Sequence, residues 1–262
     1  TLDEVSFVSV PLTIRTETQE FRDDASLDVE TMVDTLRSTK GRSYSACPSV
    51  ADWERAFGED DDVLAFTITS GLSGSFRAAC AAKLNCEENS PSRRICIIDS
   101  LSTGPEIVLL IEKAVSELSA GADFDAVCRS VQDYQRRTHL IFALESLHNL
   151  AQNGRVGKLA AAAAGMLGIR AVGTTSDEGT LDLLGKCRGR KRAVDFLQEE
   201  MERLGYTGGC VRIGHCRNTD SAGELRTAIL HRFPGANIRI YPLRGLCSYY
   251  AECGGVLVGF EA

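Results

Sequence analysis

The chain has 262 residues, of which 44% are hydrophobic, and it carries a formal net charge of -7. This length and apolar content allow a buried core divided into two lobes of ordinary domain size. The acidic balance disfavours nucleic acid as a partner, because a polyanion would be repelled overall. The longest apolar run, residues 159–169, is too short to cross a bilayer, so we expect no integral membrane segment.

Segments rich in Val, Ile and Phe alternate with stretches of helical periodicity, which is the pattern of an α/β protein. Residues 29–36 have helical spacing, and Ser49 with Asp52 indicates a capped helix that ends at Phe57. An alanine-rich helix is expected over residues 76–84. The strands predicted in this half of the chain comprise residues 5–14, 63–67 and 94–98.

The second half repeats the alternation of strands and helices. A loop over residues 153–158 leads into an alanine-rich helix predicted for residues 159–167. Residues 177–180 have the composition of a hairpin turn between two extended segments. The best boundary between lobes lies near Thr138, which gives an N-terminal α/β lobe of residues 1–137 and a C-terminal α/β lobe of residues 138–262. The strands predicted here comprise residues 139–144, 169–173, 210–214, 238–241 and 256–260.

The clearest local signal is the turn of residues 70–75, which holds two glycines and three serines between a strand and a helix. A helix N-terminus presents unpaired N–H groups and a partial positive charge, so it attracts anions. Simple helix capping by Ser73 or Ser75 is the plainer alternative. A second hydroxyl cluster, Ser43, Ser45 and Ser49, has the same two interpretations, with capping favoured.

The ten cysteines are scattered, without a CxxC pair or the spacing of a zinc site. They are expected to be reduced and mostly buried thiols in a cytoplasmic protein. No metal and no cofactor are expected. A serine hydrolase elbow, a Walker A loop and a dinucleotide-binding glycine motif are all absent from the sequence.

Four segments, in this order and at these separations, resemble the DegV family, which includes the FakB-type fatty-acid-binding proteins. They are residues 45–49 (SACPS), 70–75 (SGLSGS), 98–100 (IDS) and 153–158 (NGRVGK). The resemblance extends over essentially the whole chain. It implies a two-lobed α/β fold with a ligand tunnel between the lobes.

The resemblance also implies a function. Proteins of this family hold a long-chain fatty acid, such as palmitate, stearate or oleate, while a separate ATP-dependent fatty acid kinase phosphorylates its carboxyl group. An acyltransferase then uses the acyl phosphate for phospholipid synthesis. The chain would accordingly be a cytoplasmic carrier and not an enzyme.

Residue by residue, the resemblance places the carboxylate on the hydroxyls of Ser45 and Ser73. Because a carboxylate that leaves water must keep its hydrogen bonds, we also expect the backbone N–H groups of Gly74 and Ser75 to donate to it. Arg155 is expected in a loop at the headgroup or facing the kinase. Three features depart from the family pattern: the sequence begins after the position of the usual first strand, which is missing or lies outside this sequence, Cys47 replaces a glutamine, and Tyr250 falls where the family has a histidine. A tyrosine hydroxyl can still donate a hydrogen bond to the carboxylate.

Two other functions remain open from the residues alone. One is a serine-dependent acyl hydrolase or transferase that uses Ser73, which would need a general base within reach. The other is a protein that binds lipid only to regulate a partner.

Overall fold

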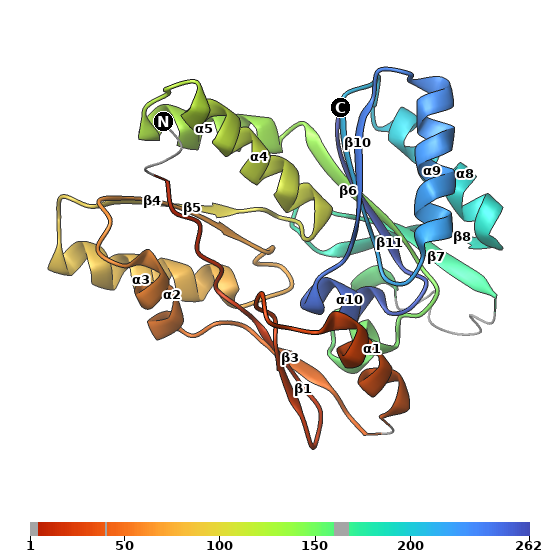
Figure 1. The fold of residues 1–262 in the computed structure, drawn as a ribbon, viewed down its shortest axis with the longest axis horizontal. Coiled ribbons are helices and arrows are strands. Elements are labelled where there is room, and N and C mark those ends of the chain that lie inside the picture. The colour runs from red at the N-terminus through yellow and green to blue at the C-terminus, as the bar shows by residue number, and fades with distance from the viewer. Residues whose placement is uncertain (1–4, 40, 160–167) are drawn as a thin grey trace.

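A computed structural model describes residues 5–39, 41–159 and 168–262, and it places three β-sheets among surrounding helices (Figure 1). The smallest sheet pairs two parallel strands, β4 (Asp62–Thr67) and β5 (Arg94–Asp99). A three-stranded antiparallel sheet has the order β2-β1-β3. Its strands are β1 (Thr13–Arg15), β2 (Glu20–Arg22) and β3 (Tyr44–Ala46).

The largest sheet has six strands in the order β10-β9-β11-β6-β7-β8, all from residues 138–261. Strands β9 and β10 are parallel, and the other neighbouring pairs are antiparallel. Its strands are β6 (Thr138–Leu144), β7 (Ile169–Thr175), β8 (Leu181–Arg188), β9 (Cys210–His215), β10 (Asn237–Pro242) and β11 (Val256–Glu261).

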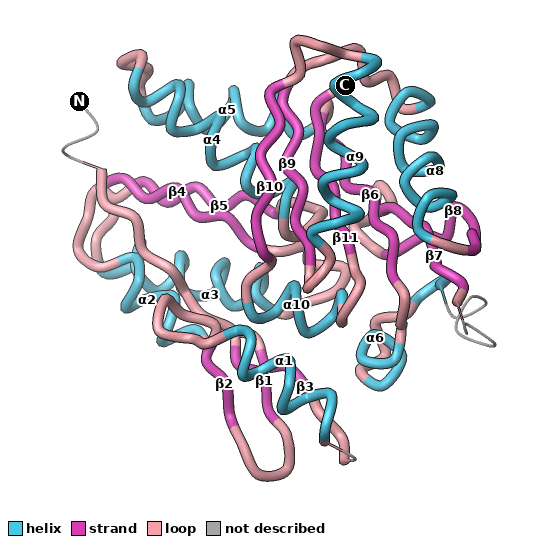
Figure 2. The backbone as a smooth tube through the Cα atoms, turned by 45° about the vertical axis from the view of Figure 1, so that its right-hand side comes forward, coloured by secondary structure: helices cyan, strands magenta, loops and turns pink. Residues whose placement is uncertain are grey.

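Both faces of the six-stranded sheet are buried, and successive residues of each strand point to opposite faces. We call the face covered by helices α8 (Arg190–Arg203) and α9 (Thr219–Arg232) the outer face and the opposite face the inner face. The outer face packs Ile141 and Val258 against α8 and α9, which Figure 2 shows together on one side of the sheet. The inner face contributes Phe142 and Leu257 to a second core. Helix α4 (Pro105–Ser119) packs on strands β9 and β11.

The remaining helices surround the smaller sheets and the inner face. Helix α2 (Val50–Phe57) begins with a capping box between Ser49 and Asp52, as predicted. The others are α1 (Val29–Ser38), α3 (Ser75–Asn89), α5 (Phe124–Gln135), α6 (His148–Gln152), the 3-10 helix η2 (Gly157–Leu159) and α10 (Gly245–Ala251).

The predicted α/β class is confirmed, and one predicted strand is largely wrong. Residues 5–12 have no regular structure, and β1 begins only at Thr13. Within the described residues no strand pairs with this segment, and Val5, Phe7 and Val8 stay in solvent, with Phe7 80% exposed. The alanine-rich helix predicted for residues 159–167 lies almost wholly outside the described residues.

Candidate functional site

A cavity of about 300 Å³ lies between the first half of the chain and the inner face of the six-stranded sheet. Most of its wall is aliphatic or aromatic, as expected for a small-molecule pocket. The apolar lining includes Leu140, Phe142, Leu144, Leu150, Leu181 and Leu257.

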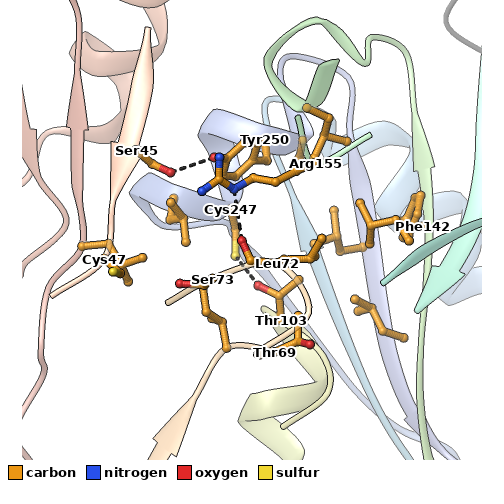
Figure 3. Close-up of a pocket in the computed structure, with 18 of the residues that line it drawn as sticks. Ser45, Cys47, Thr69, Leu72, Ser73, Thr103, Phe142, Arg155, Cys247 and Tyr250 are labelled. Atoms are coloured by element: carbon orange, nitrogen blue, oxygen red, sulfur yellow. Dashed lines mark hydrogen bonds between the residues drawn. The ribbon is translucent and has the colours of Figure 1, made fainter. Parts of the chain in front are cut away.

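Several polar groups lie together on one side of this cavity. Figure 3 shows Ser45, Cys47 and Ser73 together on the side away from Phe142. The loops that carry them are in close contact, because a Cβ added to Gly74 would lie only 3.1 Å from the Cys47 Sγ atom. One serine from each hydroxyl cluster, Ser45 and Ser73, therefore borders the same cavity.

Strand β3 and helix α10 place Ser45 and Tyr250 next to each other. Their hydroxyl oxygens are 2.7 Å apart, within hydrogen-bond distance. Burial raises the pKa of Tyr250, although the hydrogen bond with Ser45 and the charge of Arg155 act in the opposite direction. The phenol therefore keeps its proton at neutral pH and can donate a hydrogen bond.

Ser73 precedes helix α3 and has a local role there. Its Oγ accepts a hydrogen bond from the Ser75 N–H at 3.2 Å, while the N-cap position itself is Gly74, which has no side-chain cap. The Gly74 N–H has no hydrogen-bond acceptor within the described residues. A serine hydroxyl and a free backbone N–H thus border the cavity at a helix N-terminus.

Arg155 is the only charged residue in the cavity lining, as far as the chain is described. Its Nε donates to the Leu72 carbonyl at 3.1 Å, and its Nη1 donates to the Asn153 carbonyl at 2.8 Å. These bonds hold the guanidinium 5.9 Å from the centre of the Tyr250 ring. Among the described residues no carboxylate forms an ion pair with Arg155, so its charge lacks a protein counter-ion there.

A hydrogen-bonded contact fixes the turn of residues 70–75 against the β7–β8 hairpin. The Thr69 hydroxyl donates to the Gly179 carbonyl at 2.9 Å and accepts from the Gly71 N–H at 3.0 Å. Gly71 is required at this contact, because a Cβ there would lie 2.8 Å from the carbonyl oxygens of Glu178 and Gly179. The hairpin therefore positions the loop that carries Ser73.

The substitution Gly71→Ala is expected to lower the free energy of unfolding by roughly 1–3 kcal/mol, because the new methyl group collides with rigid backbone. Thermal and urea unfolding measure the effect. Gly223→Ala, at a helical site with open space around it, is the matched control and should be neutral or stabilising. Equal stability of Gly71→Ala and the wild type would contradict the close contact.

Two polar lining residues, Thr103 and Cys247, have no signal in the sequence. Thr103 lies just before α4 and Cys247 lies in α10, and their side chains approach to 3.7 Å between Oγ1 and Sγ (Figure 3). Burial raises the pKa of Cys247 to about 11, so its thiol is neutral at physiological pH. A neutral thiol is a poor nucleophile.

The lining gives little support to hydrolysis. No histidine, aspartate or glutamate of the described residues lines the cavity, so Ser73 has no general base there. Over the same residues, no cluster of histidine, cysteine and acidic side chains is suited to a metal ion. None of the helices in the described parts of the chain has both the length and the apolarity needed to cross a membrane.

Comparison with known proteins adds independent information. Residues 1–261 match the family described as "Uncharacterised protein, DegV family". A DegV domain-containing protein of Streptococcus pneumoniae is 44% identical over 256 residues, which cover 98% of this chain and 91% of the relative.

Two solved structures are similar over nearly their full length. A DegV family protein from Eubacterium eligens, loaded with heptadecanoic acid, has a TM-score of 0.95 and 42% identity over 100% of this chain and 95% of its own. The Fatty Acid Kinase (Fak) B3 protein of Streptococcus pneumoniae, loaded with linoleic acid, has a TM-score of 0.95 and 44% identity. The match covers 98% of this chain and 91% of that protein.

Proposed function

The chain belongs to the DegV family, and we propose that it binds one long-chain fatty acid in the cavity described above. The carboxylate would lie among Ser45, Ser73, Tyr250 and the Gly74 N–H, and the acyl tail would extend along the aliphatic wall. Palmitate, stearate and oleate are the expected kinds of ligand. The solved relatives loaded with heptadecanoic and linoleic acids support this ligand class.

One observation of the site carries the proposal: among the described residues, one cation without an ion-pair partner borders a cavity whose wall is otherwise mainly apolar. A charged headgroup taken out of water needs hydrogen bonds and a counter-ion, since an unpaired buried carboxylate is very unfavourable. Arg155 offers the charge, and the hydroxyls of Ser45 and Tyr250 offer donors. An apolar chain with one anionic end matches this distribution.

The apolar wall can account for tight binding. Each buried methylene contributes about 0.8 kcal/mol, so a tail of roughly sixteen carbons offers on the order of 10 kcal/mol before the costs of association. The hydroxyls then contribute mainly orientation. In this proposal the tail sets the affinity, and the polar end fixes where the carboxylate points.

We further infer that the bound acid is a substrate for another protein. A separate ATP-dependent fatty acid kinase would phosphorylate the carboxylate, and an acyltransferase would use the acyl phosphate in phospholipid synthesis. The chain itself would be a cytoplasmic carrier, and its ten free thiols suit a reducing compartment. The two lobes, residues 1–137 and 138–262, would enclose the ligand between them.

The proposal is tested by native mass spectrometry of the purified protein, followed by extraction and identification of the released lipid. One fatty acid per chain is expected. Incubation of the loaded protein with ATP and a fatty acid kinase should then yield acyl phosphate. A chain that carries no fatty acid and does not take one up would refute the proposal, as would turnover of p-nitrophenyl esters that Ser73→Ala abolishes.

Arg155→Ala is expected to weaken fatty acid binding by roughly 10- to 100-fold, because a hydrogen bond to a charged group is worth about 1.5–3 kcal/mol. Fluorescent fatty acid displacement measures the affinity. Lys158→Ala removes the same charge from the same loop, but Lys158 is 72% exposed and pairs with Asp182, so its affinity should stay near that of the wild type. Equal affinities of the two variants for fatty acid would show that Arg155 does not interact with the headgroup.

A further inference from the structure

Phe142 has an unusual place on the inner face of the six-stranded sheet. It lies on β6 directly between Leu257 of β11 and Gly173 of β7 in the strand registers. Opposite residues of neighbouring strands point to the same face, so the missing side chain at Gly173 leaves a gap beside the ring. A Cβ at Gly173 would lie 2.5 Å from Phe142 Cζ and 2.6 Å from Cε2, which shows that the ring fills this gap.

The ring also borders the cavity, on the side away from the headgroup residues. Phe142 is 3% exposed and belongs to the cavity lining. Figure 3 shows its ring on the opposite side of the pocket from Ser45 and Cys47. A tail whose carboxylate lies at Ser45 therefore runs toward this ring.

We propose that the Phe142 ring, seated over Gly173, forms the end wall of the cavity and sets the longest acyl tail that the cavity accepts. The inference rests on the proposed fatty acid function and names its specificity-determining residue. The ring rests on the sheet because a glycine lies beneath it. A larger residue at position 173 would force the ring off the sheet and into the space available to the tail.

Gly173 itself is a poor position for the main test. Its added Cβ would also lie 2.5 Å from the Asp182 carbonyl oxygen, beside an irregularity in the β7–β8 register at residues 172 and 173. Gly173→Ala would therefore disturb the hairpin as well as the ring. Substitutions of Phe142 by smaller residues remove the ring without adding a group that collides with the backbone.

The experiment compares Phe142→Ala and Phe142→Leu with the wild type. Each delipidated protein is equilibrated with an equimolar mixture of straight-chain saturated fatty acids of graded length, and the bound acids are identified by mass spectrometry. Phe142→Ala should move the preferred length upward by about two methylene groups, and Phe142→Leu by less. For each additional accommodated methylene, affinity should rise roughly fourfold.

Phe196→Ala is the matched control, because the chain offers a second ring over a glycine. A Cβ at Gly185 would lie 2.8 Å from Phe196 Cε2, but Phe196 belongs to α8 and packs against the core on the outer face of the sheet. This variant should keep the wild-type length preference. Thermal unfolding and circular dichroism establish that each variant is folded before loading.

The outcomes separate the inference from the function on which it rests. A folded Phe142→Ala protein that binds fatty acids with the wild-type length preference would overturn the end-wall role alone. An equal shift in Phe196→Ala would also overturn it, because the change would then reflect a general loosening of the core. A wild-type protein that binds none of the acids would overturn both the end wall and the proposed function.

Discussion

Replacing Ser45 and Ser73 together by alanine is expected to weaken fatty acid binding by about 100-fold or more. Each hydroxyl offers a hydrogen bond to a charged group, worth about 1.5–3 kcal/mol. The loss is large because the surrounding wall is mostly apolar and provides few substitutes. Tyr250 would also lose its hydroxyl partner at position 45. Displacement titration of a fluorescent fatty acid measures the dissociation constant of the delipidated protein.

Ser43→Ala provides the control for this double variant. Ser43 lies two residues before Ser45 and makes a comparable bond, 2.8 Å from its Oγ to the Tyr249 hydroxyl, but it does not line the cavity. Tyr249 also keeps a hydrogen bond from the Asn153 amide at 2.8 Å. Ser43→Ala should therefore affect stability more than affinity. If both variants bind as tightly as the wild type, the carboxylate lies elsewhere.

Much of the secondary structure could be predicted because its signals are local. The capping box at Ser49 and Asp52 is complete within four residues, and helix α2 begins there. Strand β6 could be predicted from the sequence because it is buried on both faces and is therefore apolar over most of its length. Strands β2 and β3 escaped prediction because three residues are too few to display an alternating pattern.

The failure at residues 5–12 has a different cause. Val5, Phe7 and Val8 give an apolar segment that satisfies strand propensity, yet they are 48–80% exposed. A strand forms only when a neighbouring strand supplies its hydrogen bonds, and such a neighbour can lie far away in the sequence. Propensity alone therefore predicts a strand where no neighbour is present among the described residues.

The candidate site could be predicted where a motif marks it. The resemblance indicated Ser45, Ser73, Arg155 and Tyr250, the position of Gly74 at a helix N-terminus added its N–H, and all five residues border one cavity. Their roles toward a ligand remain proposals. Thr103, Cys247 and the end wall at Phe142 escaped prediction because they are brought together by packing between distant strands and helices, which leaves no local pattern.

An ion pair between a buried arginine and a partly exposed glutamate joins the two halves of the chain. Arg212 of β9 has a side chain that is only 3% exposed, and its Nε lies 2.9 Å from the Glu112 Oε2 atom on α4. Helix α4 starts two residues after Thr103 of the cavity wall. The pair therefore helps to hold a wall-forming segment of the first half on the sheet of the second.

Glu112→Leu is expected to lower the free energy of unfolding by roughly 2–4 kcal/mol, since it leaves the buried Arg212 guanidinium without its counter-charge. The exposure of Glu112, 31%, places the effect below that of a fully buried pair. Urea denaturation at neutral pH measures it. Asp62→Ala breaks the Arg94–Asp62 pair, whose side chains are 48% and 41% exposed, and should cost less than about 1 kcal/mol.

The double variant Glu112→Leu with Arg212→Met distinguishes the stranded charge from lost packing. Two apolar side chains of similar size can replace a buried ion pair at little cost, so the double variant should regain most of the stability lost in Glu112→Leu. Recovery of stability would identify the unpaired guanidinium as the cause. If the double variant is no more stable than Glu112→Leu, the carboxylate stabilises α4 by packing or by its second pair, with Arg239, and not by pairing with Arg212.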